Sequence, residues 1–177
     1  MLFRDSFQFL AQSLQTLVDS LDKCEKPNQP TKFSILERMI KERRPAAPWK
    51  RLLLKDVFSY EHVKTFATLD EQQMPRRAVF FSSLTSETCS KNDYGYPQSV
   101  WLEFGCRSLR DYLQLYLTTD VCLLADVFEN FRATCHEAYK LDPAYFVSAP
   151  QLAWNAMFKK TKLEVNLLSD PEMYKMI

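Results

Sequence analysis

The longest regular pattern of apolar and polar positions lies in residues 111–132, which read DYLQLYLTTDVCLLADVFENFR. At about 100° per residue, the apolar side chains of this segment gather on one face of a single helix. They are Tyr112, Leu113, Tyr116, Leu117, Val121, Leu124, Val127, Phe128 and Phe131. The pattern predicts one long helix from about residue 108 to residue 139.

Asp120 projects from about the middle of that apolar face, one helical turn after Tyr116. Removing a carboxylate from water costs several kcal/mol unless a partner stabilises its charge. A buried Arg or Lys, a capping backbone amide or a divalent cation would each serve. Taken alone, Tyr-x-x-x-Asp is unspecific, and an Asp paired with a distant base at the edge of a core helix explains it most simply.

Weaker patterns predict the elements around this helix. The N-terminal segment has Asp5-Ser6 as an N-cap signal and helical spacing from Leu10 to Leu21. The next predictions are a loop over residues 23–32, a helix over 33–43, an extended stretch over 50–60, a short helix over 60–66 and an extended piece within 74–81. Residues 93–97 have turn chemistry and lead into a helix through Val100 and Phe104. After the long helix, Asp142-Pro143 predicts a boundary, and the residues around Trp154 have a helical pattern.

Composition constrains the fold more than the function. Only two of the 177 residues are glycine, far below the usual share of about 7%. Few positions can therefore adopt positive φ at low cost, which favours helices and open loops over tight hairpins. The net charge of +1 does not indicate a basic nucleic-acid module. Basic residues do cluster at 41–44, 50–51 and 76–77, and such runs are more often solvated faces than phosphate contacts.

The five cysteines are scattered, with no Cys-x-x-Cys pair, which is typical of reduced structural thiols in an intracellular protein. Neither His62 nor His136 has a partner at metal-ligand spacing. The sequence has no signal peptide and no membrane-spanning run, because charged and polar residues interrupt the apolar text of residues 2–10. We therefore expect a soluble, intracellular protein.

Four stretches, in order along the chain, carry a resemblance to a known family. They are RDSFQFLAQSLQTLVDSL, LLLKDVFSYEHVKTF, YLTTDVCLLADVFENFR and LDPAYFVSAPQLAWNAMFKKTKLEVNLLSDPEMYKMI. The third resembles the third exonuclease motif of family-B DNA polymerases, and the likeness is closest to the protein-primed branch of viruses, linear plasmids and Maverick/Polinton transposons. The others are similar to the segment after the second exonuclease motif, to a region that usually reads Lys-Gly-Val-Phe-Pro-Tyr-Glu, and to the passage into the polymerase domain.

The resemblance implies an α/β parent fold, a ribonuclease H-like exonuclease domain, of which this chain is a mainly α-helical fragment with few strands. Residues 1–141 would be the C-terminal part of that domain, and residues 142–177 the start of the polymerase domain on its palm side. Strands of the core sheet would lie upstream, so we expect apolar helix faces around Leu113, Leu117 and Phe128 to be partly uncovered. Asp56 and Ser59 depart from the family's usual Gly and Pro, which puts loop geometry in doubt.

The resemblance also implies site residues. In the family, the third motif supplies one metal-ligating Asp and a Tyr that orients the attacking water, and these correspond to Asp120 and Tyr116. Spacing of four places both on adjacent turns of one face. Ser6 and Phe7 match a Ser/Thr-Leu-x-x-hydrophobic motif that contacts the single-stranded primer end, with Phe where Leu is usual. The alternative, Ser6 as a helix N-cap and Phe7 as a core residue, has at least equal weight.

The parent would use two Mg²⁺ or Mn²⁺ ions, and its partners would be DNA, dNTPs and a terminal-protein primer. No Asp-x-Glu occurs before residue 70 in a strand-like context, so the first exonuclease motif is missing from this sequence. We expect the second motif upstream of Met1 and the polymerase motifs beyond Ile177. One carboxylate cannot hold two ions, so we expect the isolated chain to bind none and to be catalytically silent. The other hypothesis is a catalytically dead remnant that acts as a nucleic-acid-binding or structural module, as a truncated gene or transposon relic would leave. An unrelated helical interaction domain is the third.

Overall fold

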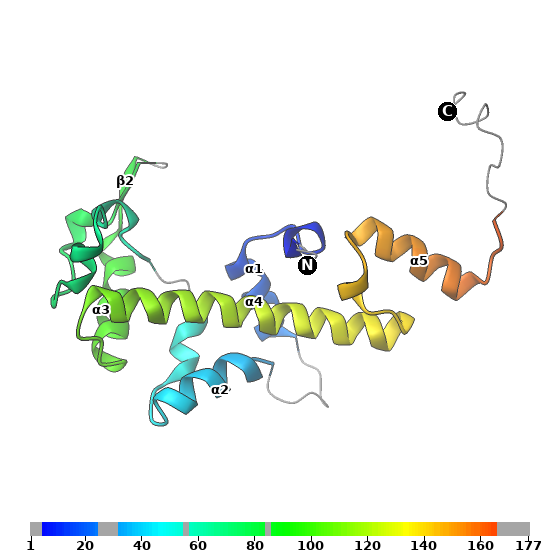
Figure 1. The fold of residues 1–177 in the computed structure, drawn as a ribbon, viewed down its shortest axis with the longest axis horizontal. Helices are drawn as coiled ribbons and strands as arrows, with labels where there is room; N and C mark the ends of the chain where they lie inside the picture. Colours follow the sequence, from blue (N-terminus) through cyan, green and yellow to red (C-terminus); the bar gives the residue numbers. More distant parts are fainter. Residues whose placement is uncertain (1–4, 25–31, 55–56, 84–85, 166–177) are drawn as a thin grey trace. The chain divides into compact units, whose positions relative to one another are not determined.

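The computed structural model describes residues 5–24, 32–54, 57–83 and 86–165 (Figure 1). These residues fall into two compact units. The central unit comprises residues 12–130, and the terminal unit combines the residues up to 11 with those from 131 onward. Both units are built mainly from helices, so the predicted α-helical character with few strands is confirmed. The ribonuclease H-like parent fold remains a prediction. No described helix is both long and apolar enough to cross a membrane.

The central unit contains three α-helices and most of a fourth. They are α1 (Leu14–Lys23), α2 (Ser34–Arg43), α3 (Lys91–Glu103) and α4 (Leu109–Tyr139), which continues into the terminal unit. Between α2 and α3 lie four 3₁₀ helices, η2 (Trp49–Leu53), η3 (Tyr60–His62), η4 (Phe66–Asp70) and η5 (Arg77–Val79). A two-residue antiparallel pair, β1 (Phe81–Ser82) with β2 (Glu87–Thr88), sets Phe81 opposite Thr88.

The terminal unit contains η1 (Ser6–Gln8), the last turns of α4, η6 (Pro143–Tyr145) and α5 (Ala149–Thr161). A bidentate ion pair between Arg132 and Asp142, at 2.9 and 2.6 Å, ties α4 to the chain that leaves it. The guanidinium holds the pKa of Asp142 at about 2. Asp142 also accepts a hydrogen bond from the Ala144 amide at the start of η6. The chain thus turns at the predicted Asp142-Pro143 boundary, whereas the two compact units divide between residues 130 and 131.

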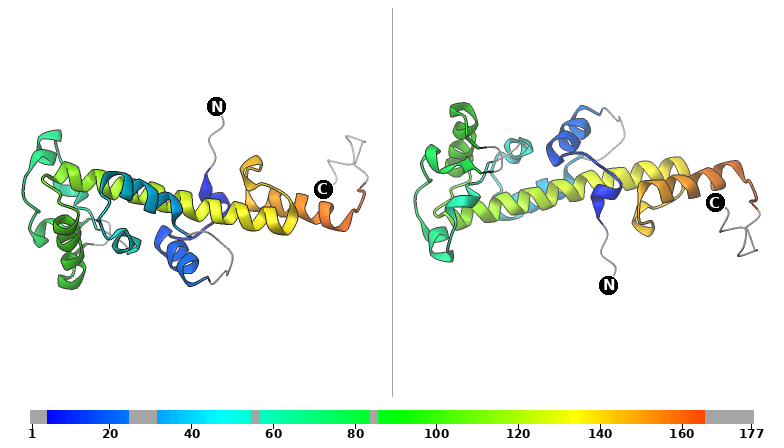
Figure 2. Two further views of the ribbon diagram at one scale, coloured as in Figure 1. Left: turned by 90° about the horizontal axis from the view of Figure 1, so that it is seen from below. Right: turned by 90° about the horizontal axis from the view of Figure 1, so that it is seen from above.

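The long helix was predicted accurately, from about 108 to 139 against Leu109–Tyr139 in the structure (Figure 2). Its buried face was predicted only in part. The buried positions are Leu109, Tyr112, Leu115, Thr119, Cys122, Leu123, Asp126, Val127 and Cys135. Leu117 is 50% exposed and Val121 68% exposed, so the apolar face predicted from the sequence is not buried as a whole. The buried face of α4 is therefore rotated about the helix axis relative to the face predicted from apolar residues alone. The rotation brings the polar residues Thr119 and Asp126 into the buried face.

The exposure of Leu117 confirms the prediction of an uncovered apolar surface at that residue, while Leu113 and Phe128 are half-buried. Leu117, Val121 and Leu124 lie at spacings of four and three, so they form one exposed stripe along α4. We call these three residues the α4 stripe.

A buried carboxylate joins α2 to α4. Asp126, 1% exposed, accepts hydrogen bonds from the backbone N–H groups of Ile35 and Leu36, both at 2.9 Å. Phe33, the N-cap residue of α2, has no side-chain acceptor for these groups, so a residue 90 positions away supplies it. Helix α2 begins at Ser34, close to the predicted start at residue 33, and Leu36 and Ile40 are buried with it.

Two segments differ from the sequence predictions because tertiary contacts override local propensity. The predicted turn at residues 93–97 is wrong, since these residues lie inside α3. Ser90 caps that helix by accepting from the Asp93 amide, and Pro97 is fully buried. The extended stretch predicted for residues 50–60 is also wrong over η2. The predicted loop at residues 23–32 lies mostly outside the described residues.

We expect the α4 stripe to make the chain bind a hydrophobic dye or associate with itself. Replacing Leu117 and Val121 together by Gln should reduce dye fluorescence and association without lowering the melting temperature, because neither side chain is buried. Leu123→Ala, at a buried site on the same helix, should instead cost about 2–5 kcal/mol of stability. Dye titration and sedimentation of the three chains would measure this, and a sharp monomeric melt of the wild type without dye binding would contradict it.

Candidate functional site

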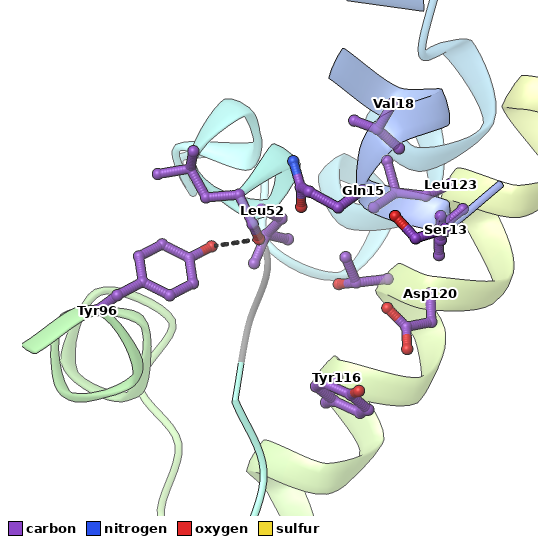
Figure 3. Close-up of a pocket in the computed structure, with 11 residues that line it drawn as sticks. Ser13, Gln15, Val18, Leu52, Tyr96, Tyr116, Asp120 and Leu123 are labelled. Atoms are coloured by element: carbon purple, nitrogen blue, oxygen red, sulfur yellow. Dashed lines mark hydrogen bonds between the residues drawn. The ribbon is translucent and has the colours of Figure 1, made fainter. Parts of the chain in front are cut away.

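The predicted pair Tyr116 and Asp120 lies at a cavity of about 200 Å³ in the central unit (Figure 3). Four parts of the chain line it: the start of α1, η2 with Leu54, Tyr96 of α3, and the middle of α4. The lining residues are Ser13, Leu14, Gln15, Val18, Leu52, Leu54, Tyr96, Tyr116, Thr119, Asp120 and Leu123. The walls are therefore largely apolar, and most of the polar groups come from α1 and α4.

Hydrogen bonds fix the wall opposite α4. The Tyr96 hydroxyl donates to the carbonyl oxygens of Arg51, at 2.5 Å, and Leu54, at 3.3 Å. The Gln15 side-chain amide donates to the carboxylate of Asp19 and to the carbonyl of Leu53, at 2.6 and 3.2 Å. These bonds tie α1 and α3 to η2, so the cavity is part of the packed unit.

Asp120 is half-buried, and that burial raises the pKa of its carboxyl above the ordinary value, while a hydrogen bond with Tyr116 partly offsets the rise. No Lys or Arg among the described residues forms an ion pair with it. The half-buried carboxylate therefore has a hydrogen bond but no positive counter-charge among the described residues. The sequence prediction that Asp120 stands in a partly desolvated place is confirmed, and its metal-binding role remains a prediction.

Tyr116 is held as a neutral phenol. Burial raises its pKa, as do a hydrogen bond with Tyr60 and the charge of Asp120. The ring also lies in an aromatic group, 5.9 Å from the ring of Phe58 and 6.2 Å from that of Tyr60, measured between centroids. A neutral phenol can donate a hydrogen bond to a water molecule or an anion without competing as a strong metal ligand. Its position and protonation therefore suit a positioning role.

Sequence reasoning missed two residues next to the predicted pair. Tyr60 contacts Tyr116 from η3, and only its place in the family-like text LLLKDVFSYEHVKTF could have indicated it. Thr119 is 6% exposed and its hydroxyl has no hydrogen-bond partner. No sequence signal singles out Thr119, because a threonine in a helix usually bonds back to a preceding carbonyl.

The other two predicted site residues lie outside the central unit. Ser6 and Phe7 belong to the terminal unit, in η1. The N-cap of η1 is Asp5, which accepts from the Phe7 amide at 2.9 Å, and Phe7 is 59% exposed. The alternative that made Ser6 a cap and Phe7 a core residue is therefore wrong. An exposed aromatic ring is available for stacking, although its role in DNA binding remains a prediction.

The described residues do not form a complete metal site. No three His, Cys, Asp or Glu side chains among them gather at one place. Mg²⁺ prefers six oxygen ligands and binds through one or two carboxylates with water or phosphate oxygens. Asp120 offers one such ligand, so a pair of ions does not fit the part of the chain that the structure describes.

Comparison with known proteins assigns no relative to this chain. No protein-family model, curated protein or solved structure matches it.

Asp120 and Asp126 of α4 should respond in opposite ways to the same substitution. Asp120→Asn should raise the melting temperature at pH 7 by a few degrees, because the amide removes a half-buried charge that has no counter-charge among the described residues. Asp126→Asn should lower it by about 2–6 °C, because an amide has only one oxygen to accept from two N–H groups. Thermal melts of both variants against the wild type would measure this.

The gain from Asp120→Asn should depend on pH. Since the folded-state pKa of Asp120 is raised, its ionisation costs stability as pH rises above about 3.8, and the full cost is present once pH exceeds the folded pKa. The advantage of the Asn variant should therefore shrink as pH falls toward 3.8. A gain that persists unchanged at that pH would contradict this explanation.

Proposed function

We propose that this chain is part of a family-B, protein-primed DNA polymerase of a virus or mobile element. It would comprise the C-terminal part of the 3′–5′ exonuclease domain and the start of the polymerase domain. The four ordered blocks of family-like sequence support the proposal, because they extend over nearly the whole chain. The ribonuclease H-like parent fold, DNA as substrate and Mg²⁺ or Mn²⁺ as cofactor are parts of the same proposal.

The observation that carries it is the contrast between Asp120 and Asp126 of α4. Burial raises the pKa of both carboxyls, but Asp126 accepts from two backbone N–H groups, whereas Asp120 stands at a cavity where the Tyr116 phenol is its one hydrogen-bond partner among the described residues. A half-buried carboxylate without a counter-charge destabilises the fold, and such residues are typical of functional sites. A divalent cation would supply the missing charge. In the complete protein, carboxylates from the first two exonuclease motifs would add the other ligands.

Tyr116 supports the same assignment. Spacing of four places its hydroxyl on the same side of α4 as the Asp120 carboxylate, as Figure 3 illustrates. Because it stays neutral, the phenol can hold a water molecule near the carboxylate without a change of its own charge. Its part in the proposed reaction is to orient that water.

The small number of candidate metal ligands favours the alternative. In that case the chain would be a catalytically dead remnant that binds nucleic acid or has a structural role. Only one candidate metal ligand stands at the cavity among the described residues. Both hypotheses predict that the isolated 177-residue chain neither degrades nor extends DNA. They differ in whether the same reading frame continues into an upstream Asp-x-Glu and a downstream Asp-Thr-Asp.

The isolated chain allows a direct test of cation binding at Asp120. We expect substoichiometric Mn²⁺ to broaden the NMR signals of residues 116–123 and of the start of α1. A single carboxylate retains no ion, in agreement with the expectation for the isolated chain, but paramagnetic broadening detects brief encounters of Mn²⁺ with it. Asp120→Asn should abolish the effect, and Asp126→Asn, on the same helix, should leave it intact. Broadening that is unchanged in the Asp120→Asn chain would refute the metal-binding role.

In the full-length protein, Asp120→Ala should remove exonuclease activity and leave polymerisation largely intact, because the two sites would lie on separate domains. Tyr116→Phe should reduce the exonuclease rate less, since it removes one positioned hydroxyl and no metal charge. Such a hydroxyl contributes about 2.7–4 kcal/mol at most. Rates on single-stranded primer ends would measure both. Equal loss in the two variants would indicate a packing defect of α4 in place of the assigned roles.

A further inference from the structure

The terminal unit contains an open cavity of about 480 Å³, which shares no lining residue with the cavity at Asp120. It lies where α5 runs beside the last turns of α4 (Figure 1). Residues of α4 between Phe131 and Tyr139 and residues of α5 between Ala149 and Lys160 line it, together with Phe9. All of them belong to the terminal unit. We call this cavity the α4–α5 groove.

The groove follows one face of each helix. Its α5 residues recur at spacings of three and four from Ala149 to Lys160, and its α4 residues at spacings of four, so each set lies on one side of its helix. At a rise of about 1.5 Å per residue, the α5 face is about 16 Å long, which is three helical turns. The groove therefore has the length of a short helix.

The walls of the groove are apolar, and part of them is exposed. Leu152 and Ala156 are 6% and 5% exposed, whereas Met157 and Tyr139 are 40% and 39% exposed. Alanines at three of the α5 positions leave room for close approach, and helices pack at interaxial distances of about 8–10 Å that depend on the side chains at the contact. Burying the exposed apolar side chains would stabilise a complex. The surface thus fits the apolar face of a third helix.

Positive charge gathers at one end of the groove. Lys160 lines this end, and the neighbouring Lys159 donates from its Nζ to the carbonyl oxygen of Lys140, just after the end of α4, at 2.7 Å. All three lysines are exposed. The C-termini of α4 and α5 contribute only about half a negative charge each, which the lysines outweigh. Among the described residues that line the groove there is no Asp or Glu. This end therefore favours a negatively charged partner.

We propose that the α4–α5 groove binds an amphipathic helix of a partner protein, with acidic residues next to the apolar face of that helix. Its apolar side chains, at spacings of three and four, cover the groove, and its acidic residues lie beside Lys140, Lys159 and Lys160. Docking of a helix into an apolar groove is a recurring mode of peptide recognition, and charge complementarity fixes its register. The proposal concerns the terminal unit alone and does not rest on the proposed function.

The test uses the 177-residue chain and two synthetic helical peptides of about sixteen residues, which exceed the three turns of the groove. Both peptides have leucine on one face, and the opposite face has glutamate in one peptide and lysine in the other. The glutamate peptide should bind several-fold more tightly and shift the NMR signals of residues 149–160, because its charges complement the lysines. Equal affinity of the two peptides, no binding of either, or shifts confined to the α4 stripe would overturn the proposal.

Charge reversal in the groove separates the role of charge from a folding defect. Lys160→Glu should weaken binding of the glutamate peptide several-fold and strengthen binding of the lysine peptide, and a folding defect cannot produce opposite changes. Lys91→Glu, at an exposed position of α3 in the central unit, makes the same change of net charge and should alter neither affinity. Weaker binding of both peptides to the Lys160→Glu chain, or equal effects of the two variants, would overturn the role of the lysines.

A bulky side chain in the groove identifies its occupant. Ala153→Trp, at an exposed lining position, should abolish binding of the glutamate peptide, whereas Asn155→Trp, exposed on the same helix and outside the lining, should not. Binding that survives Ala153→Trp overturns the groove as the site. If Ala153→Trp shifts the signals of residues 166–177 without peptide, the groove belongs to the chain's own C-terminus. If it abolishes self-association in sedimentation, the groove belongs to a second copy. Either result overturns the assignment to a partner protein.

Discussion

The contact between Asp126 and the first turn of α2 is the constraint on which the central unit depends. Its carboxylate accepts from Ile35 and Leu36, and Asn130, one turn further along α4, donates to the carbonyl of Lys32 at 3.0 Å. These bonds fix the start of α2 on α4, so that Phe33, Leu36 and Ile40 can be buried. A charge buried in this way tolerates no shift of α2 along α4, because any shift would leave the carboxylate without donors.

Aromatic packing continues the same arrangement toward the start of α4. The ring of Tyr112 lies 6.0 Å from that of Phe58 and 5.9 Å from that of Trp101, and its hydroxyl donates to the Val57 carbonyl at 2.8 Å. The segment before η3 and helix α3 are therefore held against α4 by one fully buried side chain. Because these contacts position Tyr60 beside Tyr116, the core of the unit and the candidate site share one helix face.

Beside Asp120, the packed side chains leave some polar groups without the partners that their burial calls for. Along α4, Asp126 and Tyr112 have their polar atoms satisfied within the chain, whereas Asp120 and Thr119, between them in sequence, do not. Local conflicts of this kind in an otherwise satisfied structure are expected at binding sites, since the ligand supplies the missing partners. A cation held at the Asp120 carboxylate, as we propose, would supply one of the missing partners.

Sequence alone determined the elements whose signal is local. The 3.6-residue period predicted α4 to within a residue or two at each end, and helical spacing predicted α2 and most of α1. The spacing of Tyr116 and Asp120 also placed both on one side of a helix, because four residues make about one turn. What the sequence could not provide was the rotation of α4 about its axis. The apolar periodicity groups Leu117 and Val121 with Tyr112 and Val127 on one face, whereas in the structure the first two are exposed and the last two are buried.

Only the tertiary structure decided which polar groups would be satisfied. Asp120 and Asp126 look alike in the sequence, as acidic residues in the same apolar helix, yet the partners of Asp126 come from residues 90 positions away. The local sequence also gives no sign that the buried Thr119 hydroxyl lacks a hydrogen-bond partner. Hydrogen bonding and desolvation depend on which segments meet in space, and a sequence pattern with a period of a few residues carries no information about segments so far apart.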